Sequence, residues 1–238
     1  STPSNSSAAS DVYKRQDLSG VRLYAVSDGM GGHNAGEVAS RICVEKLALA
    51  QKELQRHDSI KSAVAYLQTV IAEINNTVCN LSHTQDEFKG MGATLVLFVI
   101  CGADYAILNI GDSRAYHFNN DALIQITKDH TEGQRMLDLG LLTRKELSGF
   151  PARKNLNRYI GYGQNGYVLQ ADEYYPILDN GVMLLCSDGI SDYLPDSRIS
   201  EILHSANNLE SAGKQLVNEA VASHDADNAT VMLIPLRR

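Results

Sequence analysis

The chain has 238 residues, 44% of them hydrophobic, and its 28 acidic against 21 basic side chains give a formal charge of −7. This length and apolar content allow one well-buried core. The acidic balance argues against a nucleic-acid partner, because phosphate backbones are held mainly by clustered Lys and Arg.

The four cysteines indicate a reducing compartment. They are far apart and include no CxxC pair, so they predict neither a zinc site nor a redox dithiol: Cys43, Cys79, Cys101 and Cys186. No run approaches the ~18 apolar residues that span a bilayer, and the N-terminal segment lacks the apolar region of a signal peptide. We therefore expect a cytoplasmic protein, a monomer without a membrane partner.

The first half of the chain reads as a strand, two helices and a series of hairpins. A short apolar run predicts a strand at 21–26, before the Gly-rich loop 27–32. Apolar residues at helical spacing predict helices at 35–55 and 59–81. The pattern then changes to β-branched runs with turns at Gly102-Ala103-Asp104 and Asn119-Asn120-Asp121, which predict strands at 94–101, 105–110, 115–118 and 122–127.

The second half begins with a polar, irregular stretch and ends in helices and strands. The irregular stretch, 130 to about 163, contains short helical pieces at 132–139 and 143–147. Further strands are predicted at 167–176, 182–186 and 230–236, and further helices at 196–205 and 209–224. Hairpin-connected strands imply antiparallel sheets, and segregated helix pairs imply an α+β fold.

Aspartates follow three of the apolar runs. Asp28, Asp112 and Asp188 each end a predicted strand next to Gly or Ser, and Asp227 lies just before the last strand. Each alone is commonly a turn residue, and Asp112 could equally pair with Arg114. Converging carboxylates repel one another unless a cation neutralises them. Carboxylates at rigid strand ends beside glycine suit a hard divalent cation.

A series of short motifs covers about residues 21–236 in a fixed order. The first is Val26-Ser27-Asp28-Gly29-Met30-Gly31-Gly32-His33, followed by Gly36-Glu37. Others lie at 92–94, 109–116, 127–131, 185–192 and 227–231, and a further stretch carries Arg153, Asn155, Arg158 and Gly161. The ordered set resembles the signatures of the metal-dependent type 2C (PPM) serine/threonine protein phosphatases in their bacterial form.

The resemblance implies an α+β fold: a central sandwich of two antiparallel β-sheets flanked by helix pairs (α-β-β-α), with an irregular flap at about 133–163. It also implies two divalent cations, Mn²⁺ or Mg²⁺. Asp28 would bridge both ions, the Gly29 carbonyl would bind the second, and Asp188 and Asp227 would complete the shell of the first. Asp112, with Asp188, matches a weaker third metal site.

The same resemblance implies the hydrolysis of phosphoserine and phosphothreonine in a phosphoprotein substrate by metal-activated water. Asp28, Asp188 and Asp227 would then be catalytic through that water. Met30 occupies a position that is histidine in some relatives, so we expect a metal-bound water, rather than His33, to protonate the leaving group. We expect His130 to support the flap.

One part of the chain departs from the family pattern. The family opens with a strand that carries a phosphate-binding Arg, followed by an acidic pair, and Arg15 and Asp17 are weak substitutes for these groups. We therefore expect a disordered or non-native leader at 1–17, a single catalytic domain at 18–238, an intact first metal site and weakened turnover. Two alternatives stay open: a pseudophosphatase that binds phosphoproteins or a regulator without turnover, and a metallohydrolase of small phosphate esters.

Overall fold

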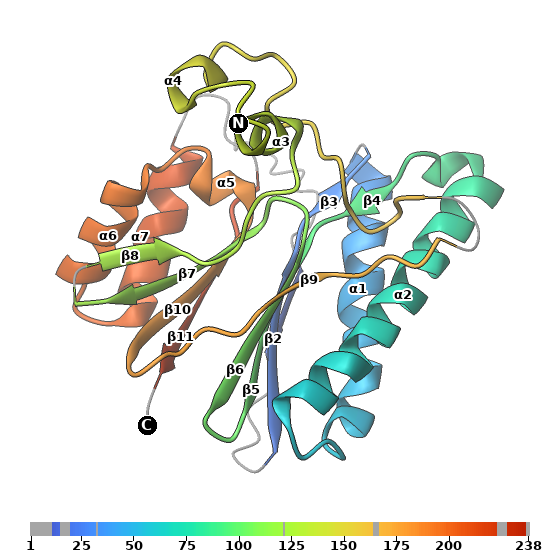
Figure 1. Ribbon diagram of the computed structural model, residues 1–238, viewed down its shortest axis with the longest axis horizontal. Coiled ribbons are helices and arrows are strands. Elements are labelled where there is room, and N and C mark those ends of the chain that lie inside the picture. Colours follow the sequence, from blue (N-terminus) through green and yellow to red (C-terminus); the bar gives the residue numbers. More distant parts are fainter. Residues whose placement is uncertain are drawn as a thin grey trace, which may run out of the picture.

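The protein is a sandwich of two antiparallel β-sheets with a pair of helices on the outer face of each sheet (Figure 1). The computed structural model describes residues 11–14, 20–31, 33–120, 122–163, 167–222 and 228–236, with only the backbone described at 11–14, 33 and 34. The layer order is therefore α-β-β-α, which confirms the expected fold class. None of the described helices combines the length and apolar character needed to cross a lipid bilayer.

The first sheet contains five strands in the order β1-β2-β5-β6-β9. All neighbours are antiparallel, and the strands are β1 (Asp11–Lys14), β2 (Val21–Ser27), β5 (Leu95–Cys101), β6 (Asp104–Ile110) and β9 (Asp172–Tyr174). The predicted turn between β5 and β6 contains Gly102 at a φ of 60°, a left-handed conformation that glycine adopts without steric penalty. A small ladder of β3 (Gly29–Met30) and β4 (Gly92–Ala93) extends from this sheet at the end where β2 finishes and β5 begins.

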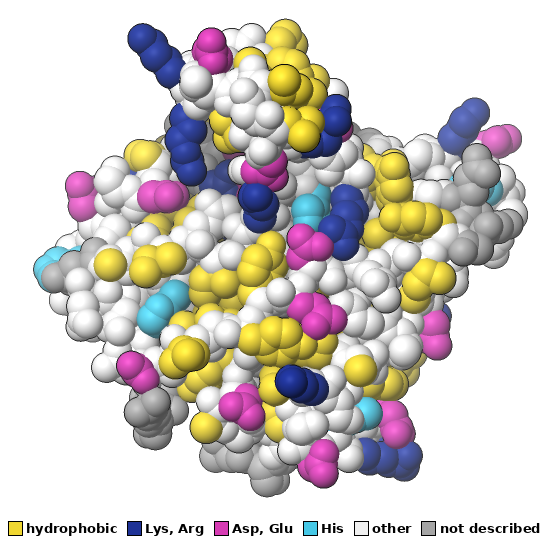
Figure 2. All heavy atoms as spheres, in the orientation of Figure 1, with side chains coloured by type: hydrophobic (Ala, Val, Ile, Leu, Met, Phe, Trp, Pro, Cys, Tyr) yellow, Lys and Arg dark blue, Asp and Glu magenta, His cyan; other side chains and the backbone are white. Residues whose placement is uncertain are grey.

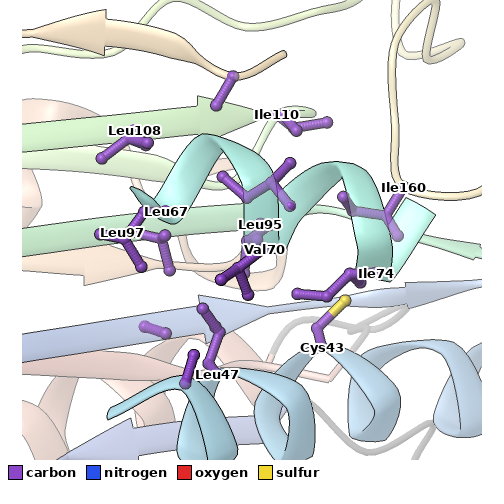
Figure 3. Packing of buried hydrophobic residues seen from close by; sticks show 14 of the residues in the cluster. Cys43, Leu47, Leu67, Val70, Ile74, Leu95, Leu97, Leu108, Ile110 and Ile160 are labelled. Atoms are coloured by element: carbon purple, nitrogen blue, oxygen red, sulfur yellow. The ribbon is translucent and has the colours of Figure 1, made fainter. Parts of the chain in front are cut away.

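Helices α1 (His33–Leu54) and α2 (Ile60–Thr84) cover the outer face of the first sheet, and the short 3₁₀ helix η1 (Asp86–Phe88) follows them. The Ser59 side chain caps α2 by accepting a hydrogen bond from the Ser62 amide. The helices bury a continuous apolar layer against the sheet (Figure 3), to which the residues labelled there contribute: Cys43, Leu47, Leu67, Val70, Ile74, Leu95, Leu97, Leu108, Ile110 and Ile160.

The second sheet has the order β11-β10-β7-β8. Its strands are β7 (Arg114–Asn119), β8 (Ala122–Gln125), β10 (Gly181–Cys186) and β11 (Val231–Leu236), again antiparallel. The outer face is covered by α6 (Asp196–Ser205) and α7 (Leu209–Val221), and the single-turn helix α5 (Asp188–Ser191) directly follows the end of β10. A capping box between Asn208 and Ser211 fixes the start of α7.

One apolar layer lies between the first sheet and its helices, and another between the second sheet and its helices. A third apolar layer fills the space between the two sheets. Successive side chains of a strand point to opposite faces, so β5 sends Leu95 and Leu97 toward the helices and Phe98 toward the opposite sheet. In the same way β10 sends Met183 inward and Leu184 toward α6 and α7. Strands buried on both faces explain why the sequence shows continuous apolar runs here instead of strict alternation.

The flap (residues 133–163) projects from one end of the sandwich (Figure 1). It contains most of α3 (Glu132–Asp138) and all of α4 (Arg144–Leu147), close to the two short helices predicted from the sequence. Backbone hydrogen bonds close its base, from the Glu132 amide to the Asn155 carbonyl at 2.9 Å and from the Gly133 amide to the Arg153 carbonyl at 3.2 Å. The two segments at the base of the flap are therefore joined to each other.

Two expectations from the sequence need correction. Residues 11–14 lie in the segment expected to be a leader, but they form β1 and pair with β2; the rest of 1–17 lies outside the described residues, and the domain boundary at residue 18 stays a prediction. The segment 167–176 forms a strand only at β9. The Gln68 side chain, from α2, bonds both the amide and the carbonyl of Ala171 at 2.9 Å, so these groups are satisfied without a strand ladder.

Replacing Phe98 with alanine should destabilise the protein strongly. Phe98 is buried between the sheets, and its ring stacks 6.3 Å from that of Tyr24 and 5.8 Å from that of Tyr105, centroid to centroid. We expect Phe98→Ala to lower the free energy of unfolding by about 3–5 kcal/mol in a denaturant titration. Ile124→Ala is the control, because Ile124 is 58% exposed, and it should change that energy by less than about 0.5 kcal/mol. Equal effects of the two substitutions would contradict the inter-sheet position of Phe98.

Candidate functional site

A pocket of about 580 Å³ lies between the flap and the strand ends of the sandwich. Asp28 follows β2 and Asp112 follows β6 in the first sheet, whereas Asp188 follows β10 in the second. The structure brings all three aspartates together in the wall of this pocket, which is lined by Asp28, Gly29, Met30, Thr94, Asp112, Lys154, Asn155, Leu156, Tyr159 and Asp188. Asp227, the fourth predicted carboxylate, lies outside the described residues.

Thr94 ties the first two aspartate-bearing loops to each other. Its hydroxyl accepts a hydrogen bond from the Asp28 amide at 3.0 Å and is bonded to the Ser113 hydroxyl at 2.6 Å. Its amide donates to the Asp28 carbonyl at 2.8 Å, and its carbonyl accepts from the Ser27 hydroxyl at 2.7 Å. One residue thus fixes the position of Asp28 relative to the loop that carries Asp112.

Two glycines allow backbone segments to meet at the pocket. A Cβ atom on Gly29 would lie 2.1 Å from the carbonyl oxygen of Gly36 in α1, so only glycine fits while the helix stays in place. Gly111, directly before Asp112, has a φ of 100°, and a Cβ there would lie 2.7 Å from a side-chain carbon of Thr94. The sequence signal Asp-Gly and Gly-Asp therefore reflects close packing as well as turn geometry.

His130 holds the loop before Asp112 through both its backbone and its side chain. Its amide donates to the Gly111 carbonyl at 3.0 Å, and its Nδ1 accepts from the Gly111 amide at 3.0 Å. Nε2 therefore carries the proton and donates to the Asp172 carboxylate at 3.1 Å. Asp172 also pairs with Arg158 at 2.6 Å. The expected supporting role of His130 thus has a concrete form, which links the loop to β9 and to the base of the flap.

Asp188 is positioned by contacts between β10 and the segment before β11. The Ser187 hydroxyl donates to the Asn228 carbonyl at 3.2 Å and accepts from the Thr230 amide at 3.0 Å. A Cβ on Gly189 would lie 2.2 Å from the Asn228 carbonyl oxygen. The residue that follows Asp227 in the chain is therefore packed directly against both neighbours of Asp188.

The electrostatics of the site favour a cation. Burial raises the pKa of Asp112 well above its ordinary range, and the negative charge of Asp188 raises it further. Arg114 does not offset this charge. Its guanidinium instead forms a bidentate pair with Asp129, with bonds of 2.9 and 2.6 Å. The alternative pairing of Asp112 with Arg114 is thus wrong.

The donor set fits a hard divalent cation, although it is not complete within the described residues. Carboxylate and carbonyl oxygens are the ligands that Mg²⁺ and Mn²⁺ prefer, and they are what Asp28, Gly29, Asp112 and Asp188 bring to the pocket. In the part of the chain that the structure describes, no group of three or more Asp, Glu, His or Cys side chains could hold a metal by itself. That part lacks Asp227, which supplies one carboxylate of the predicted set.

Several residues of the pocket wall carry no role in the sequence analysis. Lys154 and Tyr159 come from the flap, and Lys154 lies 2.6 Å from Asp192. Neither residue has a motif that identifies it, because the fold of the flap back over the strand ends brings them there. Met30 does line the pocket, whereas His33 begins α1 and its side chain is not described.

Removing the Thr94 hydroxyl should destabilise the protein through unmet hydrogen bonds. In Thr94→Val the Asp28 amide and the Ser113 hydroxyl lose a buried partner, and we expect the free energy of unfolding to fall by about 1–3 kcal/mol. Thr69→Val is the matched control, because the Thr69 hydroxyl bonds only the exposed Tyr66 carbonyl of its own helix. Denaturant titrations of both variants test this. An equal loss of unfolding free energy in the two variants would show that the Thr94 hydroxyl bonds do not stabilise the site.

The stability of the protein should decrease in mildly acidic solution because of His130. Burial lowers the pKa of His130 below 6.5, and this outweighs the opposing hydrogen bond to Asp172. The unfolded chain therefore takes up a proton first, so the stabilisation is complete above about pH 6.5 and is lost as the pH falls through the lowered pKa. We expect His130→Gln to flatten the pH dependence of unfolding between about pH 7 and pH 5. An NMR titration that gave His130 a pKa of 6.5 or higher would contradict this.

Comparison with known proteins identifies relatives over nearly the whole chain. The sequence model of the protein phosphatase 2C family matches residues 3–223. The serine/threonine phosphatase stp of Listeria innocua is 32% identical over 94% of this chain and 87% of its own length. The serine/threonine protein phosphatase PstP of Mycobacterium tuberculosis is 34% identical over 90% of this chain and 40% of its own length.

Solved structures agree with these relatives. Stp1 from Staphylococcus aureus superposes with a TM-score of 0.85 at 30% identity, covering 97% of this chain and 89% of that one. The catalytic domain of PstP in complex with two manganese ions superposes with a TM-score of 0.74 at 30% identity, covering 94% of this chain and 95% of that one. The resemblance seen in the motifs is confirmed, and the chain belongs to the protein phosphatase 2C family of serine/threonine protein phosphatases.

Proposed function

We propose that Asp28, the Gly29 carbonyl, Asp188 and Asp227 hold two divalent cations, Mn²⁺ or Mg²⁺, and that this centre hydrolyses phosphoserine and phosphothreonine in proteins. Asp112, together with Asp188, would hold a third ion more weakly. The observation that carries the proposal is the meeting of three aspartates, from strand ends of both sheets, in the wall of one pocket. The two manganese ions of the PstP catalytic domain support the number of ions.

The chemistry of a phosphate ester matches this pocket. Bound divalent cations lower the pKa of a water molecule and neutralise charge on phosphoryl oxygens. The aspartates would hold the ions at fixed strand ends, and Gly29 lines the same pocket. The raised pKa of Asp112 supports the presence of cations, because clustered buried carboxylates stay ionised only when their charge is compensated.

The position of Asp227 is supported by its neighbour. Asn228 packs against Ser187 and Gly189, the two residues that flank Asp188. We therefore propose Asp227 as the carboxylate that joins Asp188 at the first ion. The resemblance of residues 227–231 to the last signature of the family is what identified it.

Lys154 is the residue we assign to the phosphoryl group itself. It is the one cationic side chain among the described residues that line the pocket, and the phosphate-binding Arg of the family has no clear counterpart in this sequence. The Lys154 ammonium group has three N–H donors, so it can donate to a phosphoryl oxygen while it stays paired with Asp192. The proton donor to the leaving group would be a metal-bound water.

The substrate is a phosphoprotein, as the family implies, and we propose that the protein acts on it as a cytoplasmic monomer. The four cysteines, all within the described part of the chain, form no disulfide, which suits a reducing compartment. The formal charge of −7 opposes binding to nucleic acid. No membrane partner is proposed.

Loss of an aspartate at the centre should abolish turnover while leaving the fold intact. We expect Asp28→Asn and Asp188→Ala each to lower the kcat/KM for a phosphothreonine peptide in Mn²⁺ by roughly a hundredfold or more, since a charged ligand is lost. Isothermal calorimetry should show weaker Mn²⁺ binding in both variants. Asp104→Asn is the control, because Asp104 begins β6 at the exposed hairpin.

The outcomes separate the competing functions. A rate unaffected by Asp188→Ala would refute the assignment. Manganese binding without hydrolysis of any phosphopeptide would support the pseudophosphatase, an alternative that gains no support from relatives that are named as phosphatases. Hydrolysis of small phosphate esters but not of phosphopeptides would indicate a metallohydrolase of small phosphate esters.

A further inference from the structure

A second pocket, of about 370 Å³, lies beside the catalytic pocket, between the flap and the second sheet. We refer to it as the flap pocket. The two pockets share Asp112, Lys154 and Asp188 in their walls, so a peptide bound at one extends readily into the other. Figure 2 shows dark-blue Lys and Arg side chains along the left edge of the flap, above the α6–α7 side of the molecule.

Two of the four basic side chains that line the flap pocket are already neutralised. Arg114 forms its bidentate pair with Asp129, with the shortest bond at 2.6 Å. Lys154 lies 2.6 Å from Asp192. These two pairs cancel, so neither gives the pocket a net charge.

Two arginines of the flap differ from these pairs. Among the described residues, the guanidinium groups of Arg144 and Arg153 have no hydrogen bond or ion pair, although both line the pocket. Their backbones are fixed nonetheless. Arg144 follows the cap residue Thr143, whose amide donates to the Glu146 carboxylate at 2.8 Å, and the Arg153 carbonyl accepts from the Gly133 amide at 3.2 Å.

The charge balance of the flap pocket therefore favours an anion. Asp112 and Asp188 are neutralised by the cations of the proposed function, and Asp196, at the start of α6, is the acidic lining residue that is left. The two positive guanidinium groups of Arg144 and Arg153 therefore outnumber the one remaining carboxylate in the wall of the pocket. Planar guanidinium donors bind carboxylates and phosphates in the same bidentate manner.

We propose that the flap pocket is a substrate subsite in which Arg144 and Arg153 bind an acidic group that flanks the phosphorylated residue, either a carboxylate or a second phosphate. The inference rests on the proposed function, because it concerns the substrate of the same site. It assigns the enzyme a preference for phosphoproteins with acidic or doubly phosphorylated segments. The flap selects the substrate through charge, and the aspartate centre performs the hydrolysis.

Matched phosphothreonine peptides test the subsite. They differ at one flanking position at a time, which carries Glu, phosphoserine, Ala or Lys. At the position that reaches the pocket, we expect the kcat/KM for the Glu or phosphoserine peptide to exceed that for the Ala peptide by roughly threefold to tenfold, the range expected for two partly exposed ion pairs. A larger gain with phosphoserine than with Glu identifies a doubly phosphorylated substrate, and the reverse identifies an acidic one.

The double variant Arg144→Gln/Arg153→Gln should remove this preference, and Arg144→Glu/Arg153→Glu should transfer it to the Lys peptide. Fluorescence anisotropy of labelled peptides that carry a non-hydrolysable phosphonate in place of the phosphate, measured with the Mn²⁺-loaded protein, gives a readout without turnover, and it should rank the peptides in the same order. Lys145→Gln is the control, because Lys145 neighbours Arg144 in α4 but does not line the pocket, and it should leave the ranking unchanged. Circular dichroism checks that every variant is folded.

A wild-type enzyme that hydrolyses all peptides at equal rates overturns the subsite but leaves the proposed function standing. A preference that survives in both double variants overturns it as well. If no peptide is hydrolysed, the proposed function fails, and the anisotropy ranking still decides whether the two arginines bind an acidic group.

Discussion

The rest of the structure depends on one constraint: Asp28, Asp112 and Asp188 are held in the wall of one pocket, at the end that the two β-sheets share. Asp28 and Asp188 come from different sheets, yet they line one pocket with Asp112 between them in the chain. Like charges held together oppose folding, so the three apolar layers must keep them in place. A cation bound there, as in the proposed function, would offset this repulsion and stabilise the folded state by mass action.

Buried polar side chains carry the rigidity of the sheets into the loops of the site. Strand ladders end before the aspartates, and there hydroxyl and imidazole groups take over: Thr94 joins two loops of the first sheet, His130 holds Gly111, and Ser187 joins β10 to the segment before β11. Each is buried and hydrogen-bonded, which is what makes a buried polar group stabilising. The apolar core thus supplies the framework, and these few groups set the geometry of the loops that line the pocket.

Most elements followed from strong local signals in the sequence, and the gathering of the aspartates followed from motifs that resemble those of the family. Apolar periodicity placed α1, α2 and β10 within a few residues of their ends, and the motifs placed Asp28, Asp112 and Asp188. The shortness of β9 could not be predicted, since a Gln68 side chain distant in sequence satisfies the backbone beside it. The same holds for Arg114, which has Asp129 as its partner although Asp112 is closer in the chain. Lys154 reaches the pocket only through the folding of the flap.

The bond between Asp172 and His130 joins the site to one edge of the first sheet. β9 is an edge strand with three ladder residues, paired on one side with β6. Edge strands of this length fray at a free energy well below that of global unfolding, and fraying separates Asp172 from His130. Fraying therefore removes one of the contacts that orient the His130 ring, which accepts a hydrogen bond from the Gly111 amide. A molecule that adds a strand to that edge would tighten the Asp112 loop without touching the pocket.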